Sequence, residues 1–267
     1  MIRIITAALL ASLALPALAE DVTLDCLADP AASVAVGSPV TGILREVFVG
    51  RGDRVTTGDL LARLDSTIEQ ADVAVAQAHA NATELVEAQR TKLSFAEANL
   101  ERGRALAESG TVTQSRIEEL EALVAVARSD LATEERRRDL AGIELERSQA
   151  VLSLRTLTSP IDGFVTAQGT QAGEFLRQDS VVFTIIATDP LYIEAYAPAE
   201  LFGRIKAGDS GSINLEQPQG TVVDAVVSVV DPVFDAASGT FGLRLELPNP
   251  EDGFPAGQRC TVTLALS

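Results

Sequence analysis

One passage occurs twice in this chain, and the distance between the two copies is constant. The small and turn-forming positions recur in order, Ser38, Pro39, Gly42 and Gly52 returning as Ser159, Pro160, Gly163 and Gly173. The apolar positions recur with them, Leu60, Leu61 and Leu64 returning as Val181, Val182 and Ile185. Glycine-bounded segments with alternating apolar residues are typical of short β-strands, and one such unit cannot bury its apolar face alone. The repeat therefore predicts two small β units that pack on each other.

Composition restricts the partners of the chain. Its 267 residues are 46% hydrophobic and 22% charged, which is enough to form a core in two or more compact units. Lys and Arg number 21 against 38 Asp and Glu, so the formal net charge of −17 repels phosphate backbones. With 4% aromatic residues and no Trp, platforms for stacking bases are scarce. We therefore expect no nucleic-acid partner.

The first 19 residues have the pattern of a cleaved export signal. A basic residue, a short apolar run and a small-residue cleavage pattern follow one another: Arg3, Ile4–Leu15 and Ala17–Ala19. Pro16 interrupts the run well short of the roughly 20 apolar residues that span a bilayer. Cys26 follows the charged Asp25, which does not resemble a lipid-attachment site. We expect a mature periplasmic chain from Glu20, held at the membrane by its protein partners.

Between the two copies the hydrophobic period becomes helical. Residues 66–108 and 115–152 contain few helix breakers and are rich in Ala, Leu, Glu, Gln and Arg. In the second run the apolar residues keep a seven-residue spacing: Ile117, Val124, Leu131, Leu145 and Leu152, flanked by Leu120, Ala127 and Ala141. In the first run the phase changes, from Ile68, Val75 and Ala82 to Val86, Leu93, Leu100 and Ala107. This predicts a phase slip within one continuous helix.

The boundaries of these helices predict an antiparallel hairpin. Gly110 is placed to end the first helix, and Ser115 with Glu118 fits a capping box that starts the second. Each arm would be about 60 Å long at 1.5 Å per residue, with its tip at residues 109–114. Two helices cannot enclose a bundle core, which takes three or four. The hairpin must therefore project from the β units.

These residues resemble a known family. The segments "SPVTGILREVFVGRGDRVTTGDLLARLD" and "SPIDGFVTAQGTQAGEFLRQDSVVFTIIATD" are similar to the two halves of a biotinyl/lipoyl-type domain. Their separation by a coiled-coil hairpin resembles the periplasmic adaptors, or HlyD-like membrane fusion proteins, of bacterial efflux and secretion systems. Arg102, Leu106, Thr113 and Glu118 fall at the spacing of the Arg, Leu, Ser and Asp tip signature of adaptors in resistance-nodulation-division (RND) pumps. Thr replaces Ser and Glu replaces Asp in that signature.

The C-terminal third resembles the β-barrel domain of the same family. Residues from about 191 alternate like strands, with a short helix predicted at 198–206 and a turn at 255–257 before the last strand. Many of these adaptors continue into a membrane-proximal domain, and the resemblance ends with the barrel, which we therefore expect to face the transporter. The implied fold is α+β and elongated, with a split lipoyl-like (barrel-sandwich hybrid) domain, an α-hairpin and a β-barrel. Its expected divisions are a signal peptide at 1–19, an N-terminal strand segment at 20–37, lipoyl-like halves at 38–65 and 156–187, the hairpin at 66–155 and the barrel at 188–267.

The resemblance implies a non-catalytic role. An adaptor of this kind joins an inner-membrane RND transporter to an outer-membrane channel through the four tip residues, and it forms a homo-oligomeric ring, hexameric in the assembled pump. Three alternatives remain: an adaptor of an ABC-type exporter, a biotin or lipoate carrier, and a simple coiled-coil scaffold. A carrier needs its modified lysine in the turn between the half-domains, where the chain has Lys92 in mid-helix.

No arrangement of side chains in the sequence indicates catalysis. His79 is the only histidine and lies within a predicted helix, where a solvated or packed side chain is the commoner role. One Met and two Cys cannot form a soft-metal cluster. No paired carboxylates, phosphate-binding glycine loop or nucleophile with a base stands out. We expect no enzymatic activity, no cofactor and no resident metal.

The two cysteines, Cys26 and Cys260, can form a disulfide. Export places them in an oxidising compartment, where disulfides persist. An N-terminal strand near Val22–Cys26 could lie beside the last strand of the barrel and bring the two thiols together. Two separate buried thiols are the alternative.

Overall fold

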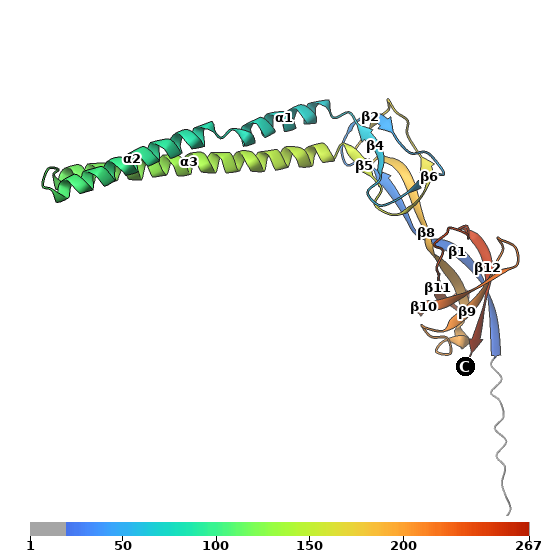
Figure 1. Ribbon diagram of the computed structural model, residues 1–267. Coiled ribbons are helices and arrows are strands. Elements are labelled where there is room, and N and C mark those ends of the chain that lie inside the picture. Colours follow the sequence, from blue (N-terminus) through green and yellow to red (C-terminus); the bar gives the residue numbers. More distant parts are fainter. Residues whose placement is uncertain (1–19, 267) are drawn as a thin grey trace, which may run out of the picture.

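The computed structural model describes residues 20–266, so the expected signal peptide lies outside the described residues. The molecule is elongated, with a long α-hairpin, a barrel-sandwich domain at its base and a β-barrel beyond that domain (Figure 1). Its buried apolar side chains form two clusters, one in each β domain. The α+β architecture expected from the family resemblance is confirmed.

The barrel-sandwich domain is assembled from both copies of the repeat. The first copy contributes β2 (Gly42–Val47), β3 (Arg54–Val55) and β4 (Leu60–Leu64), and the second contributes β5 (Thr156–Thr158), β6 (Gly163–Gln168), β7 (Phe175–Leu176) and the start of β8 (Val181–Pro198). Strand β3 pairs with β6, and the equivalent strands β7 and β2 pair with each other. The two copies therefore exchange equivalent strands across their interface.

The hydrogen bonds between the copies are reciprocal. Gly52 N donates to Val165 O over 2.8 Å, and its counterpart Gly173 N donates to Leu44 O over 2.7 Å. The hydroxyls of the buried Ser38 and Ser159 each donate to the carbonyl two residues on, both over 2.5 Å. Residues at equivalent positions of the repeat thus make equivalent hydrogen bonds. The prediction that the two repeated units pack on each other is confirmed.

The segment between the copies is a hairpin of three helices: α1 (Thr67–Asn81), α2 (Glu84–Glu108) and α3 (Gln114–Ser153). Both α1 and α2 pack along the single long helix α3 (Figure 1). The prediction of one continuous first helix is wrong, because Ala82 adopts an extended conformation with φ −73° and ψ 105°. The break lies where the apolar phase changes, so each segment turns its own face to α3.

The buried face of α2 and α3 is the predicted one, whereas that of α1 is not. Val86 on α2 and Ile117, Leu120 and Val124 on α3 are buried. On α1 the predicted track is exposed, since Ile68 is 73% and Val75 is 58% accessible, and the buried residue is Ala76. The small Ala76, and not the larger Ile68 or Val75, is therefore the buried residue of α1.

The C-terminal domain is a closed β-barrel. Its strands are the first part of β1 (Glu20–Gly37), the second part of β8, β9 (Ser210–Leu215), β10 (Thr221–Asp235), β11 (Thr240–Leu247) and β12 (Gln258–Leu266). The ladder runs β1-β12-β9-β10-β11-β8 and closes by pairing β8 with β1. The helix predicted at 198–206 is reduced to a single 3₁₀ turn, η1 (Ala199–Leu201). Alternation along these strands fills one core with apolar side chains.

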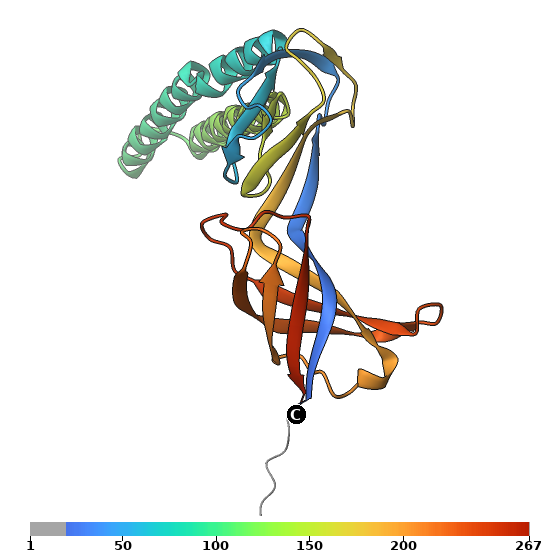
Figure 2. The same cartoon turned by 90° about the vertical axis from the view of Figure 1, so that its right-hand side faces the viewer.

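Two strands run through both β domains. In Figure 2 the blue strand β1 and the gold strand β8 pass from the barrel into the barrel-sandwich domain side by side. They pair antiparallel over most of their length, from Cys26 opposite Ala195 to Gly37 opposite Val181. These strands connect the barrel to the domain that bears the hairpin.

Candidate docking site at the hairpin tip

The hairpin reverses direction through a compact helix cap. Helix α2 ends at Glu108, after which Gly110 takes a left-handed φ of +74°. Gly110 N donates to Ala107 O over 2.9 Å and Thr111 N donates to Leu106 O over 3.0 Å. These two bonds form a Schellman motif, which satisfies carbonyls at the end of the helix. Gly110 therefore ends α2 as the sequence predicts.

The start of α3 differs from the predicted capping box. The N-cap residue is Thr113, and α3 begins at Gln114, so Ser115 lies inside the first turn. Arg116 N donates to the backbone carbonyl of Thr113 over 3.0 Å, and the Thr113 hydroxyl makes no capping hydrogen bond. The hydroxyl of Thr113 is thus left at the exposed surface of the tip.

The four residues of the proposed signature gather at this free end. Arg102 and Leu106 lie on the last turns of α2, and Thr113 and Glu118 lie at the start of α3. All four are exposed, with Leu106 49% accessible. Arg102 Nη2 donates to Asn99 Oδ1 over 2.5 Å on its own helix. The arrangement presents a cation, an apolar group, a hydroxyl and a carboxylate at the exposed end of the hairpin.

A glycine beneath the tip sets the spacing of the two helices, and sequence analysis did not single it out. Gly103 is buried in α2, and a Cβ atom there would lie 2.6 Å from Leu120 Cδ1 and 3.4 Å from Ile117 Cδ1. A glycine inside a strongly helical segment costs about 1 kcal/mol relative to alanine. That unfavourable choice is the signal that could have revealed the close contact.

The base of the hairpin is fixed to the barrel-sandwich domain by Arg155. Its Nη2 atom lies 2.5 Å from Glu69 Oε1 on α1, and its Nη1 atom donates to Thr41 O over 2.8 Å. The side chains of this ion pair are 22% and 12% exposed, so water screens the pair less than it screens surface pairs. Nearby, hydrogen bonds from the backbone and hydroxyl of Thr67 lower the pKa of Asp65. The base of the hairpin is thus attached to the barrel-sandwich domain by side-chain contacts, with the tip at its far end.

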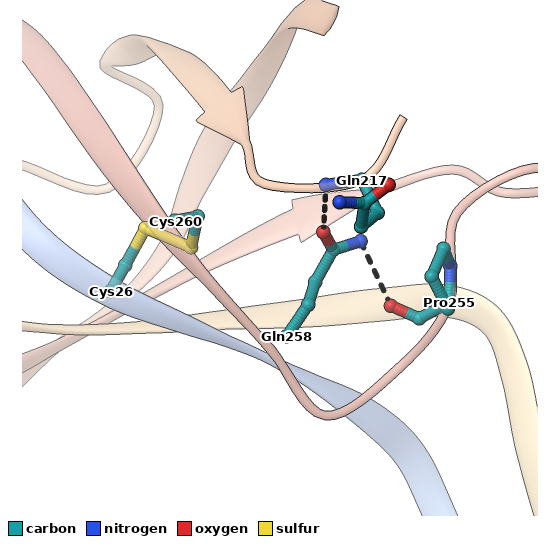
Figure 3. The surroundings of a disulfide bond; sticks show 5 residues. All are labelled: Cys26, Gln217, Pro255, Gln258 and Cys260. Carbon is teal, nitrogen blue, oxygen red and sulfur yellow. Dashed lines mark hydrogen bonds between the residues drawn. A yellow bond between two sulfur atoms is a disulfide. The ribbon is translucent and has the colours of Figure 1, made fainter. Parts of the chain in front are cut away.

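The cysteines lie together in the barrel, far from the hairpin. Cys26 on β1 is directly opposite Cys260 on β12, with 4.9 Å between their Cα atoms and the two sulfur atoms bonded (Figure 3). In the same figure Gln258 accepts a hydrogen bond from Gln217 N over 2.7 Å and donates to Pro255 O over 2.9 Å. The pair joins the N-terminal strand of the described chain to the last strand.

Two hollows among the described residues are lined in part by titratable side chains. One of about 900 Å³ lies on the barrel beside the cysteine pair, with Glu194 and Arg259 in its lining. Another, of about 340 Å³ between α1 and α3, includes the exposed His79. Between residues 20 and 266 no three His, Cys, Asp or Glu side chains are grouped to hold a metal ion. Lys92 lies within helix α2, and not in a turn that joins the two half-domains as a biotin or lipoate carrier would need.

No helix among residues 20–266 is both long enough and apolar enough to cross a membrane. A barrel-sandwich domain that carries a long α-hairpin and leads into a β-barrel is the architecture of membrane fusion proteins, the adaptor class. The chain belongs to this family: residues 32–187 match the family described as "CzcB-like, barrel-sandwich hybrid domain", and residues 190–267 match "CusB-like, beta-barrel domain". The family resemblance read from the sequence is confirmed.

Relatives of the chain are named for metal resistance and for nodulation. The nickel and cobalt resistance protein CnrB of Cupriavidus metallidurans is 28% identical over 88% of this chain and 55% of its own length. The nodulation protein NolF of Rhizobium meliloti is 26% identical over 84% of this chain and 58% of its own length. The chain thus spans little more than half the length of these curated relatives.

Among solved structures, the crystal structure of MacA from Actinobacillus actinomycetemcomitans has the same fold. The TM-score is 0.77 with 21% identity, and the match covers 94% of this chain and 79% of MacA. At this identity the likeness establishes the arrangement of domains and not the substrate.

Proposed function

We propose that this protein is a non-catalytic periplasmic adaptor that links an inner-membrane RND efflux transporter to an outer-membrane channel. The exposed tip supports this proposal most directly. It lies at the end of a hairpin whose base is held by Arg155. Membership of the adaptor family supports the proposal further, as do relatives named for nickel and cobalt resistance and for cation efflux. In this role the hairpin meets the channel, and small molecules or metal ions cross the envelope through the assembly.

Tip substitutions test the docking role. In a strain that lacks the gene, Arg102→Asp and Leu106→Asp should abolish complementation for sensitivity to drugs and to nickel, cobalt and zinc ions. Both residues are exposed, so the free energy of unfolding should change by less than about 0.5 kcal/mol. The matched control is Arg147→Asp on the shaft, where Arg147 is also exposed and forms an ion pair with Glu144. Full complementation by both tip variants would contradict the docking assignment.

Cross-linking from the tip identifies the partners. A photo-crosslinker at Thr113 or Glu118 should capture an outer-membrane channel, and affinity purification of the full chain should recover an RND transporter. Recovery of an ABC-type transporter would replace the RND assignment and keep the adaptor role. Recovery of a biotin- or lipoate-dependent enzyme would overturn the adaptor role itself.

Homo-oligomerisation has its own support in the hairpin. On one side of the α2–α3 pair the exposed Phe95, Leu123 and Val126 line a mostly apolar groove of about 270 Å³. Apolar side chains in this number on a projecting element favour contact with further helices. We propose a ring of identical copies, hexameric in the assembled pump. Analytical ultracentrifugation should show oligomers that Phe95→Asp reduces to monomer.

The periplasmic location follows from the N-terminal pattern and is part of the proposal. Sequencing of the exported protein should begin at Glu20. Without its transporter the protein should fractionate with the periplasm, and co-expression should move it to the membrane pellet, from which deletion of residues 191–267 should release it. Membrane association that survives a carbonate wash in the absence of partners would contradict cleavage of residues 1–19.

A further inference from the structure

The two β domains are joined by β1 and β8, and their pairing is interrupted at the junction. It stops after Pro30 opposite Leu191 and resumes at Ala32 opposite Ala187, with a shift in register. Residues 188–190 of β8 therefore bulge beside a single residue of β1. A bulge bends a strand and removes ladder hydrogen bonds. The junction is thus the place where the barrel can bend relative to the barrel-sandwich domain.

The loop between β11 and β12 covers this bulge from the barrel side (Figure 2). Asn249, which is 2% exposed, donates through its Nδ2 atom to Thr188 O over 2.9 Å and to Phe254 O over 3.0 Å. Its backbone N donates to Asp189 Oδ1 over 2.8 Å. Two of these hydrogen bonds therefore hold the loop against the bulge at the end of the barrel.

Asp252 on this loop points its carboxylate across the junction. One oxygen, Oδ1, accepts a hydrogen bond from Thr188 Oγ1 over 2.6 Å. The other, Oδ2, lies 2.8 Å from Nη1 of Arg54, which belongs to β3 of the barrel-sandwich domain. Oδ2 is buried and has no well-aligned hydrogen-bond donor, so the charge of Arg54 is its main compensation. A buried carboxylate oxygen is costly without such a partner.

The backbone at Asp252 is left-handed, with a φ of +52°. Glycine favours this conformation, and aspartate is among the other residues that adopt it most readily. Such a conformation persists when the surrounding contacts outweigh its cost. The contacts of the Asp252 carboxylate with Thr188 and Arg54 supply this compensation.

Arg54 is oriented from its own side of the junction. On strand β3, Arg54 lies opposite Phe164 of strand β6. The guanidinium of Arg54 lies 5.7 Å from the centre of the Phe164 ring. Stacking on an aromatic face restricts a guanidinium and adds a modest attraction. The cation is therefore presented to Asp252 by a strand of the other domain.

We propose that Arg54 and Asp252 form an interdomain latch that holds the β-barrel at one angle to the barrel-sandwich domain. When the ion pair opens, the domains bend at residues 188–190, and the direction of the hairpin changes relative to the barrel. The latch is a property of the single chain and does not depend on the identity of any transporter or channel.

Interdomain distances measured by pulsed electron resonance test the latch. Spin-labelled non-canonical residues at the exposed positions Gln178 and Glu200 report on the two domains. The labelled chain without further substitutions should give one narrow distribution of distances between the labels. The distribution should be broad in both Arg54→Met and Asp252→Asn. The double variant should be no broader than either single variant, because both substitutions remove the same contact.

The control is Arg63→Met. Arg63 also pairs with a carboxylate, Glu46 at 3.5 Å, and lies 5.6 Å from the ring of Phe48, but all three residues belong to the barrel-sandwich domain. It should leave the distribution narrow. Should Arg54→Met fail to fold, Asp252→Asn, which keeps the size of the side chain, decides the question. Narrow distributions in the latch variants, additive broadening in the double variant, or equal broadening in the control would overturn the proposal.

Discussion

The barrel-sandwich domain and the α-hairpin that projects from it stabilise themselves in different ways. The domain encloses a cluster in which Leu44, Leu61, Leu64, Phe183 and Ile185 are fully buried. The much longer hairpin buries only a single line of residues: Ala76, Val86, Gly103, Ile117, Leu120 and Val124. Large apolar side chains such as Phe95 and Leu140 remain exposed on its shaft. The domain thus has an enclosed apolar core, whereas the hairpin has a narrow buried contact and large apolar side chains at its surface.

The two regions differ because their apolar side chains are buried by different kinds of contact. In the domain, the two repeated units donate and accept equivalent hydrogen bonds across their interface. A substitution in one unit therefore also disturbs the packing of the other. In the hairpin, contact is confined to one face of each helix, and side chains at its edges can move into solvent. Substitutions should therefore cost most in the domain and least on the hairpin, which gives the following expectations, from the largest to the smallest effect on stability.

The largest effect is expected for Gly163→Ala in the barrel-sandwich domain. A Cβ atom there would overlap the backbone carbonyl oxygen of Ile186 and lie 2.7 Å from its carbon. Because the obstacle is backbone within a strand pair, the loss should be at least about 3 kcal/mol, the upper end for overpacked cores. Urea denaturation measures it.

The control for this change is the repeat counterpart, Gly42→Ala. Its Cβ atom would meet Arg155 Nη1 at 2.7 Å and Leu64 Cδ2 at 3.0 Å, which are side-chain atoms and not backbone. It should cost less than Gly163→Ala. Equal losses would show that the two repeats are more alike in their packing than the structure indicates.

A smaller loss is expected on removing the cysteine pair from the barrel. Closing a chain segment with a sequence separation of 234 residues restricts the unfolded state, and such bridges contribute about 2–4 kcal/mol. Cys26→Ala combined with Cys260→Ala should lower the melting temperature by the same amount that a reductant lowers that of the unaltered protein. Non-reducing peptide mapping of periplasmic protein checks the bridge, and two free thiols would refute it.

The same contrast explains what sequence could predict. The repeat, the helical period and Gly110 each leave a local pattern, so the domain order and the end of α2 could be foreseen. The change of apolar phase marked the position of the break at Ala82 but not its extended conformation. The burial of Ala76 in place of Val75 could not be foreseen, because it depends on how α1 packs against α3. The four tip residues were placed by resemblance. Gly103 leaves a local signal, a glycine inside a strongly helical segment, whereas the Arg54–Asp252 contact joins segments that no local pattern relates.

Gly103→Ala should have a moderate effect confined to the hairpin. Overpacking against Leu120 costs about 1–3 kcal/mol, while the higher helix propensity of alanine returns about 1 kcal/mol. We expect a net loss of about 1 kcal/mol from these two terms, since Leu120 can shift toward solvent. The control, Gly142→Ala on α3, has no atom within 4 Å of the added Cβ and should stabilise the helix. Circular dichroism at 222 nm measures both, and stabilisation by both would mean that Gly103 does not set the helix spacing.

The smallest effect is a pH dependence found in both regions. Asp162 accepts hydrogen bonds from the backbone N and hydroxyl of Thr57, over 2.6 and 2.8 Å, which lower its pKa and join the two halves of the domain. Asp65 accepts the equivalent pair of bonds from Thr67 at the base of the hairpin, which likewise lower its pKa. In each case the folded pKa lies below the unfolded value. The stabilisation is therefore complete above the unfolded pKa and is lost as the pH falls through the folded one.

Thr57→Val and Thr67→Val separate the two regions through this pH dependence. Each variant removes only the hydroxyl donor, so the pKa of its aspartate should rise part of the way to the ordinary value while the backbone bond remains. At pH 7 both variants should melt earlier than the unaltered protein, and the difference should shrink below about pH 4, where the unfolded aspartates protonate. Because Asp162 closes the domain whereas Asp65 serves the hairpin, Thr57→Val should lower the melting of the β domains and Thr67→Val only the helical signal. A difference that stays constant from pH 7 to pH 3 would show that the lost packing of the hydroxyl, and not its bond to the carboxylate, is responsible.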